Sequence, residues 1–292
     1  MRKFFRFITT LTIITFSLPG RAEEATSGQI QTLIQKSGLS AQLEQLPQIL
    51  EMGLNQSRQK NKESLAPEEF EMLKNAMIVS YDPAILQKSV SDYILVKISK
   101  EEIDQILSWL DSPIGRKIIK LEEDTATPEG EEKMENMSEE LYKDEDRIAL
   151  VQELDEAIRG SESNVEMVLS IQYAMAVSMA IAIDPGNQDL LDNVMKRVMA
   201  GRRQMTEVVR ESTLKNYLYT YHTLQPGEIR QYIEFAKTAY GMKYFQVITE
   251  SLSKGIIEAS RNVGKIFGQS LKKAKEETRE EKKDQAVDSK EP

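Results

Sequence analysis

The chain has 292 residues, and its 47 aspartates and glutamates outnumber its 38 lysines and arginines, which gives a formal net charge of −9. An acidic surface repels nucleic acid and anionic lipid headgroups, because both are bound through lysine and arginine. There is no cysteine and one histidine, which excludes disulfides, a lipid-modified cysteine and zinc sites built from these two residue types.

The first 22 residues have the layout of a secretory signal peptide. A positive start with Arg2, Lys3 and Arg6 precedes a short apolar stretch and the small residues Gly20 and Ala22. The apolar stretch is shorter than the ~20 residues needed to span a bilayer. We therefore expect cleavage after Ala22, with Ala25 as the second choice. The mature protein is expected to be periplasmic, not an integral membrane protein, and to carry a charge of −13.

From Leu43 onward, apolar residues recur at spacings of three and four, which is typical of helices. Asp82-Pro83 predicts a helix start, and Ser99 followed by Glu102 forms a capping box. Ser112-Pro113 starts the next helix, since proline suits the first turn. At the corresponding Thr238-Ala239 we expect a bend without a restart. No stretch alternates like a strand, so the predicted fold is all-α.

Residues 93–120 align without a gap to residues 219–246, which predicts a tandem duplication. The expected helical bundles are repeat one (23–145) and a diverged repeat two (146–270). A charged tail (271–292) has too few apolar residues to fold and is expected to be disordered. The matching pairs are Glu102/Glu228, Trp109/Phe235, Ser112/Thr238, Gly115/Gly241 and Lys117/Lys243.

These motifs resemble the bacterial domain of unknown function 2059 family. The resemblance rests on Asp82-Pro83, the run 99–103, Trp109 and the run 112–117, which is similar to that family's serine-proline-x-glycine-x-lysine segment. The second copy keeps Gly241 and Lys243 but lacks the Ser-Pro pair. The resemblance implies a helical, exported envelope protein of Gram-negative bacteria and implies no activity.

The sequence contains few of the residue types on which catalytic sites depend. The only histidine, His222, lies at an expected helix end, where a cation is favoured by the helix dipole. Acidic clusters at 101–104 and 122–124 leave a carboxylate-dependent hydrolase open, but Glu102 and Glu228 are better explained by helix capping. We predict no catalytic, cofactor-binding or metal-binding residue and no cofactor.

Two other features bear on function. Gly115 and Gly241 indicate a close helix approach, and Lys117 and Lys243 are expected to be solvated. The apolar stretch 165–183 predicts a central buried helix, along which Met167, Met175 and Met179 lie. Methionine is pliable and accepts varied apolar partners, so these three residues could line an apolar groove.

Three hypotheses follow from the sequence. The favoured one is a non-enzymatic binding module, monomeric or weakly dimeric, for an envelope protein or a lipid-like ligand. The alternatives are a structural or assembly protein of the envelope and the carboxylate-dependent hydrolase. Nucleic acid is not an expected partner.

Overall fold

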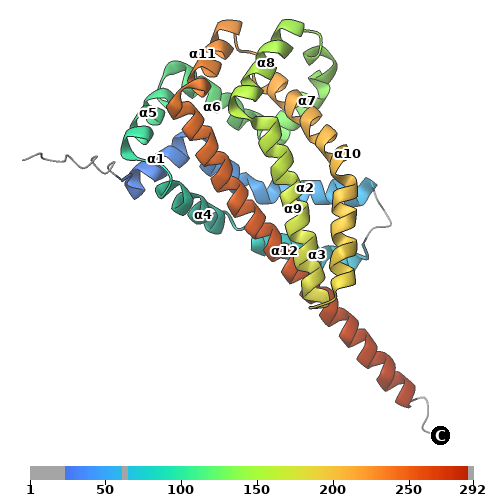
Figure 1. Cartoon of the computed structure of the whole chain (residues 1–292). Helices are drawn as coiled ribbons and strands as arrows, with labels where there is room; N and C mark the ends of the chain where they lie inside the picture. Colours follow the sequence, from blue (N-terminus) through green and yellow to red (C-terminus); the bar gives the residue numbers. More distant parts are fainter. Residues whose placement is uncertain (1–23, 61–64, 289–292) are drawn as a thin grey trace, which may run out of the picture.

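The computed structural model describes residues 24–60 and 65–288, and the predicted all-α fold is confirmed in them. The proposed signal peptide and its cleavage site lie outside the described residues. The described residues form twelve helices and no strand (Figure 1). The helices are α1 (Ser27–Lys36), α2 (Leu39–Lys60), α3 (Pro67–Ser80), α4 (Pro83–Leu95), α5 (Lys100–Leu110), α6 (Pro113–Thr125), α7 (Pro128–Leu141), α8 (Glu145–Ile158), α9 (Gly160–Ile183), α10 (Gln188–Thr220), α11 (Pro226–Lys237) and α12 (Ala239–Asp288).

Short polar signals determine where several helices begin. Asp82 accepts hydrogen bonds from the backbone N–H groups of Ala84 (2.9 Å) and Ile85 (3.1 Å) at the start of α4. Ser99 and Glu102 form the predicted capping box of α5. These side chains satisfy N–H groups that the first turn of a helix leaves free.

Helix α12 packs against α3, α4 and α9 and so connects these three helices (Figure 1). Its approach to α9 is close because of Gly264 and Gly268, which lie one turn apart on the same face. A Cβ atom on these glycines would lie 2.1 Å from the carbonyl oxygen of Met175 and 2.7 Å from that of Met179. Any side chain at either glycine would therefore push the two helices apart.

One hydrophobic core holds most of the chain together. It contains buried residues from both expected repeats, such as Ile30, Ile103, Ile229 and Val263. A smaller cluster lies around Leu141 and the residues packed on it. The expected boundary at 145/146 falls at the first residue of α8, and the segments on either side of it share a core.

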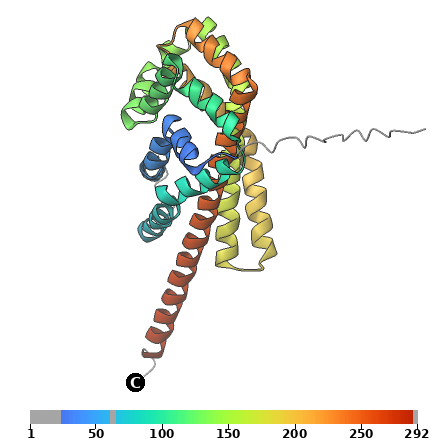
Figure 2. The same cartoon turned by 90° about the vertical axis from the view of Figure 1, so that its left-hand side faces the viewer.

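The expectation that the stretch 165–183 is a buried helix is wrong. In α9, only Ala174 and Ala180 are buried, and Tyr173 and Ile181 are 44% and 47% exposed. The reason is tertiary: α9 and α10 form a hairpin that projects beside α12, and these two neighbours cover only part of the α9 surface (Figure 2).

Two further local expectations differ from the structure. A new helix begins at Ala239, because Thr238 caps its first turn by the same hydrogen bond that a serine makes. Helix α12 also continues through the charged segment to Asp288, where a disordered tail was expected. Lysine and glutamate are good helix formers, and pairs such as Lys273–Glu277 (3.6 Å) stabilise exposed turns.

Candidate functional site

The residues of the repeated motif form two similar helix corners. At the first, Ser112 accepts a hydrogen bond from the N–H of Gly115 (3.0 Å), and a Cβ atom on Gly115 would lie 2.3 Å from the carbonyl oxygen of Trp109. Pro113 occupies the first turn of α6. Because α6 starts so close to the end of α5, only glycine fits at position 115.

At the second corner, Thr238 accepts from the N–H of Gly241 (2.9 Å), and a Cβ atom there would lie 1.9 Å from the carbonyl oxygen of Phe235. The two corners meet in the core, where the rings of Trp109 and Phe235 stack with centroids 3.9 Å apart and an interplanar angle of 9°. The motif residues thus hold helices α5, α6, α11 and α12 together.

The charged motif residues stabilise helix ends and one contact between helices. Glu102 accepts from the backbone N–H of Ser99 (2.7 Å), and Glu228 accepts from that of Gln225 (2.8 Å). Lys117, which was expected to be solvated, forms an ion pair with Glu228 at 2.7 Å. This contact is the largest of the causes that lower the pKa of Glu228. Lys243 is half-buried and has no ion pair among the described residues.

The most unusual group of side chains in the core lines a cavity of about 320 Å³ between α6, α9, α10, α11 and α12. We call it the tyrosine pocket. Its wall includes four tyrosines and one carboxyl group, and no lysine or arginine is among its lining residues. The defining residues are Glu122, Tyr217, Tyr221, Tyr232 and Tyr244.

Glu122 accepts hydrogen bonds from two of the tyrosines in the tyrosine pocket. The hydroxyl groups of Tyr221 and Tyr232 donate hydrogen bonds to its Oε1 at 2.8 and 3.0 Å. Burial raises the pKa of the Glu122 carboxyl, an effect that these two hydrogen bonds partly offset. Its Oε2 accepts no hydrogen bond from the described residues. The residue is only partly buried, so its side chain keeps access to the cavity that it lines.

The tyrosines remain neutral hydrogen-bond donors at any physiological pH. Burial, together with the nearby Glu122 carboxyl, raises the pKa values of Tyr221 and Tyr232 well above their ordinary value. Burial likewise raises the pKa values of Tyr217 and Tyr244. Ionisation of a phenol next to a carboxyl in the interior would place two negative charges together.

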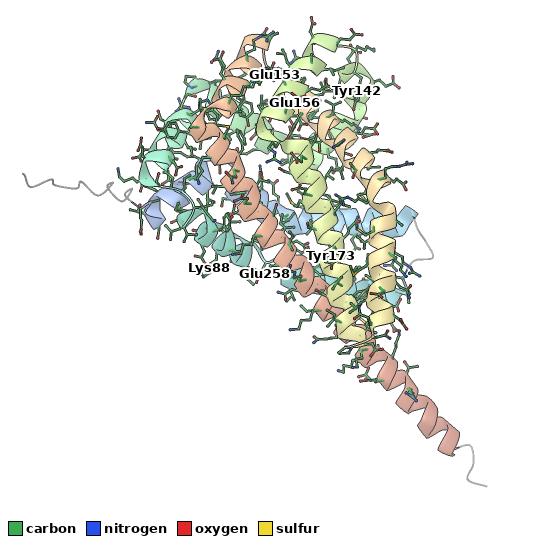
Figure 3. The ribbon with its side chains drawn as sticks, in the orientation of Figure 1. Lys88, Tyr142, Glu153, Glu156, Tyr173 and Glu258 are labelled. Atoms are coloured by element: carbon green, nitrogen blue, oxygen red, sulfur yellow. The ribbon has the colours of Figure 1, made fainter. Side chains whose placement is uncertain are left out.

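A larger cavity of about 820 Å³ adjoins the tyrosine pocket, between α8 and α9 on one side and α12 on the other. Glu156, labelled in Figure 3, is among the residues that line it. Five residues line both cavities: Ile158, Ser163, Met167, Phe245 and Thr249. These five side chains would therefore border a ligand in either cavity.

Of the three methionines suggested for an apolar groove, only Met167 lines these cavities. Met175 and Met179 instead pack on the core where α9 crosses Gly264 and Gly268 of α12. The sequence analysis included Glu122 in an acidic cluster but did not single out the tyrosines. The pair Tyr217 and Tyr221, four residues apart on one helix face, was the available signal.

Comparison with known proteins gives no match to a family model, to a curated protein or to a solved structure. Among the described helices, α9 is long and apolar enough to cross a membrane by length and composition. A core helix of a soluble protein passes the same test, but only 11% of the relevant α9 segment is buried.

Proposed function

We propose that the protein is an exported, non-enzymatic binding protein and that the tyrosine pocket holds a small molecule with an amine or quaternary ammonium group. The observation that carries this proposal is the Glu122 carboxyl at the wall of an aromatic cavity, with one oxygen unused by the described residues. Burying a carboxyl group destabilises the fold unless it is fully paired. Groups retained at such a cost, with perturbed pKa values, concentrate at functional sites.

The composition of the wall favours a cation. Aromatic faces attract cations through their quadrupole, and carboxylates attract them directly. The lining residues include no lysine or arginine that would compete for Glu122. A bound cation would also favour the charged form of Glu122 and so offset the burial that raises its pKa.

Binding explains the site better than hydrolysis does. A two-carboxylate hydrolase needs a second acid facing the first across the cavity. No second carboxylate is among the residues that line the pocket. Asp155 acts on Tyr217 electrostatically, but its Oδ1 accepts a hydrogen bond from the backbone N–H of Ser161 at 2.7 Å. That hydrogen bond satisfies a free N–H at the start of α9, so Asp155 has a structural task.

The proposed duplication is consistent with the two corners. Ser112 and Gly115 make one corner, and Thr238 and Gly241 make the other with the same hydrogen bond at 3.0 and 2.9 Å. Both corners place the glycine against the carbonyl oxygen of the residue six positions earlier. Two copies of one ancestral helical unit would produce this arrangement.

The same alignment gives the tyrosine pocket an origin in the second repeat. Tyr232 and Tyr244 align with Ile106 and Ile118, which are ordinary core residues. Replacing isoleucine by tyrosine adds hydroxyl groups to the interior, one of which donates to Glu122. We infer that repeat two acquired the tyrosines of this site, while repeat one supplies Glu122.

Export remains part of the proposal. It is supported by the signal-peptide pattern of residues 1–22. Mass spectrometry of the N-terminus of the protein from a periplasmic extract tests it. A first residue at Glu23 supports export, and an intact Met1 contradicts it.

The pocket is tested by calorimetric titration with choline and with its neutral isostere 3,3-dimethyl-1-butanol. We expect choline to bind and the neutral isostere to bind at least about tenfold more weakly. Glu122→Gln keeps the shape and removes the charge, so it should abolish the preference for choline. Glu129→Gln, the same change at an exposed position outside the pocket, should leave binding unaffected. Equal affinity for both probes, or an unchanged Glu122→Gln variant, contradicts the proposal.

A further inference from the structure

Charge is unevenly distributed over the molecule. We define the arm as residues 167–210 and 254–275, which comprise most of the α9–α10 hairpin and the part of α12 beside it (Figure 2). The arm carries 11 lysines and arginines and five aspartates and glutamates, a formal charge of +6. Since the whole chain has a charge of −9, the rest of it is strongly acidic.

Most basic side chains of the arm have no acidic partner. Outside the arm, many lysines form ion pairs, for example Lys36, Lys117, Lys215 and Lys237. Among the described residues, no carboxylate lies within ion-pair distance of six basic residues in the arm. These six are Lys196, Arg197, Arg202, Arg203, Arg261 and Lys265, and all six are exposed.

The arm also exposes large apolar side chains. Tyr173, labelled on α9 in Figure 3, is 44% exposed, and Ile181, Met195 and Met199 are 47%, 41% and 60% exposed. A helix that is apolar on all sides is ordinarily covered by protein or by lipid. Helix α9 has this composition and is covered only in part.

Basic and apolar features meet in one groove. A hollow of about 410 Å³ lies between α9, α10 and α12, with Leu169, Tyr173 and Met199 among its apolar lining residues. Arg202 and Arg261 line the same hollow, from α10 and from α12, and Glu166 of α9 is the one carboxylate among its lining residues. An apolar floor with guanidinium groups beside it matches an acyl chain below a phosphate.

We propose that the arm docks on the surface of an anionic phospholipid membrane. Its apolar side chains enter the interface, and Arg202 and Arg261 bind lipid phosphates. Arm-to-arm association of two copies is disfavoured, because two arms of charge +6 repel each other. Nucleic acid would match the charge but would gain little from Ile181 and Met199. The acidic net charge of the chain predicts repulsion from such membranes, and the proposal departs from that expectation for the arm alone.

The test is sedimentation of the protein, purified from cells that express the whole chain, with vesicles. Vesicles of phosphatidylglycerol and phosphatidylcholine should bind it, and vesicles of phosphatidylcholine alone should bind it much more weakly. Each basic residue near an anionic surface contributes about fivefold in affinity. The double variant Arg202→Gln/Arg261→Gln should therefore weaken binding by about 30-fold.

A matched control separates docking from simple charge. Arg116→Gln/Lys133→Gln removes the same charge from exposed positions outside the arm and should change binding less than threefold. The apolar contribution is tested by Ile181→Gln/Met199→Gln, which should weaken binding without a change in its salt dependence. The proposal is overturned if the protein ignores anionic vesicles or if both double charge variants behave alike. Tighter binding to duplex DNA than to the vesicles, or dimerisation through the arm in solution, would also overturn it. Because the choline titration does not involve the arm, the two proposals can fail separately.

Discussion

Replacing Gly241 by alanine should destabilise the protein, although alanine is the better helix former. The new Cβ atom would lie 1.9 Å from the carbonyl oxygen of Phe235, and real Cβ contacts essentially never fall below 3.0 Å. The two helices must therefore separate by about 1 Å, and the obstacle is backbone that cannot rotate away. Overpacking of this kind costs about 3 kcal/mol, against a gain of about 1 kcal/mol in helix propensity.

The expected net loss is about 2 kcal/mol, or a fall in Tm of about 4–8 °C. Thermal unfolding followed by circular dichroism measures it. Gly201→Ala is the matched control, because no heavy atom lies within 4 Å of the new Cβ in the exposed middle of α10. This control should raise Tm by about 2–4 °C. If Gly241→Ala is as stable as Gly201→Ala, the close approach of α12 to the end of α11 at Gly241 is contradicted.

Three other predictions concern single contacts. Because burial raises the pKa of Glu122, the folded state holds that proton at a pH where the unfolded chain releases it. The free energy of unfolding should then fall as pH rises from about 4.5 through the raised pKa. The total fall is about 1.4 kcal/mol for each pH unit by which the pKa of Glu122 in the folded state exceeds its pKa in the unfolded chain. Glu122→Gln should lose this dependence in urea titrations at several pH values, and an unchanged profile would contradict the assignment. Gly264→Leu, whose side chain would meet the backbone of Met175, should cost about 3 kcal/mol or more in the same assay, and a neutral effect would disprove the close crossing. Lys117→Met removes a half-exposed ion pair with Glu228 and should lower the free energy of unfolding by less than about 1 kcal/mol. A loss above about 2 kcal/mol would show that this ion pair stabilises the fold more than an exposed contact should.

The features that the sequence predicted well depend on neighbouring residues. The all-α fold follows from apolar spacing, and the caps at Ser99 and Ser112 require only residues up to three positions away. Where such local reasoning failed, as at Thr238, the hydroxyl group of threonine performed the same task without the following proline. Charged segments near residue 272 were misjudged because helix propensity can suffice where apolar residues are lacking.

The features that could not be predicted depend on contacts between distant residues. Glu122 and Tyr232 are 110 positions apart, and Lys117 and Glu228 are 111 positions apart. The exposure of α9 depends on how many neighbours its hairpin meets, which periodicity does not encode. The net charge of the chain is likewise a sum over the basic arm and the acidic remainder. Only the arrangement of the helices shows that the basic residues lie together.

The central claim is that the tyrosine pocket holds a small cationic molecule. Native mass spectrometry of the protein, isolated gently from its own cells, tests it most directly, with the Glu122→Gln variant prepared in parallel. The account predicts a reproducible extra mass on the wild-type protein that is lost on denaturation and is absent from the variant. A bare chain mass for both proteins, or the same extra mass on both, would contradict it.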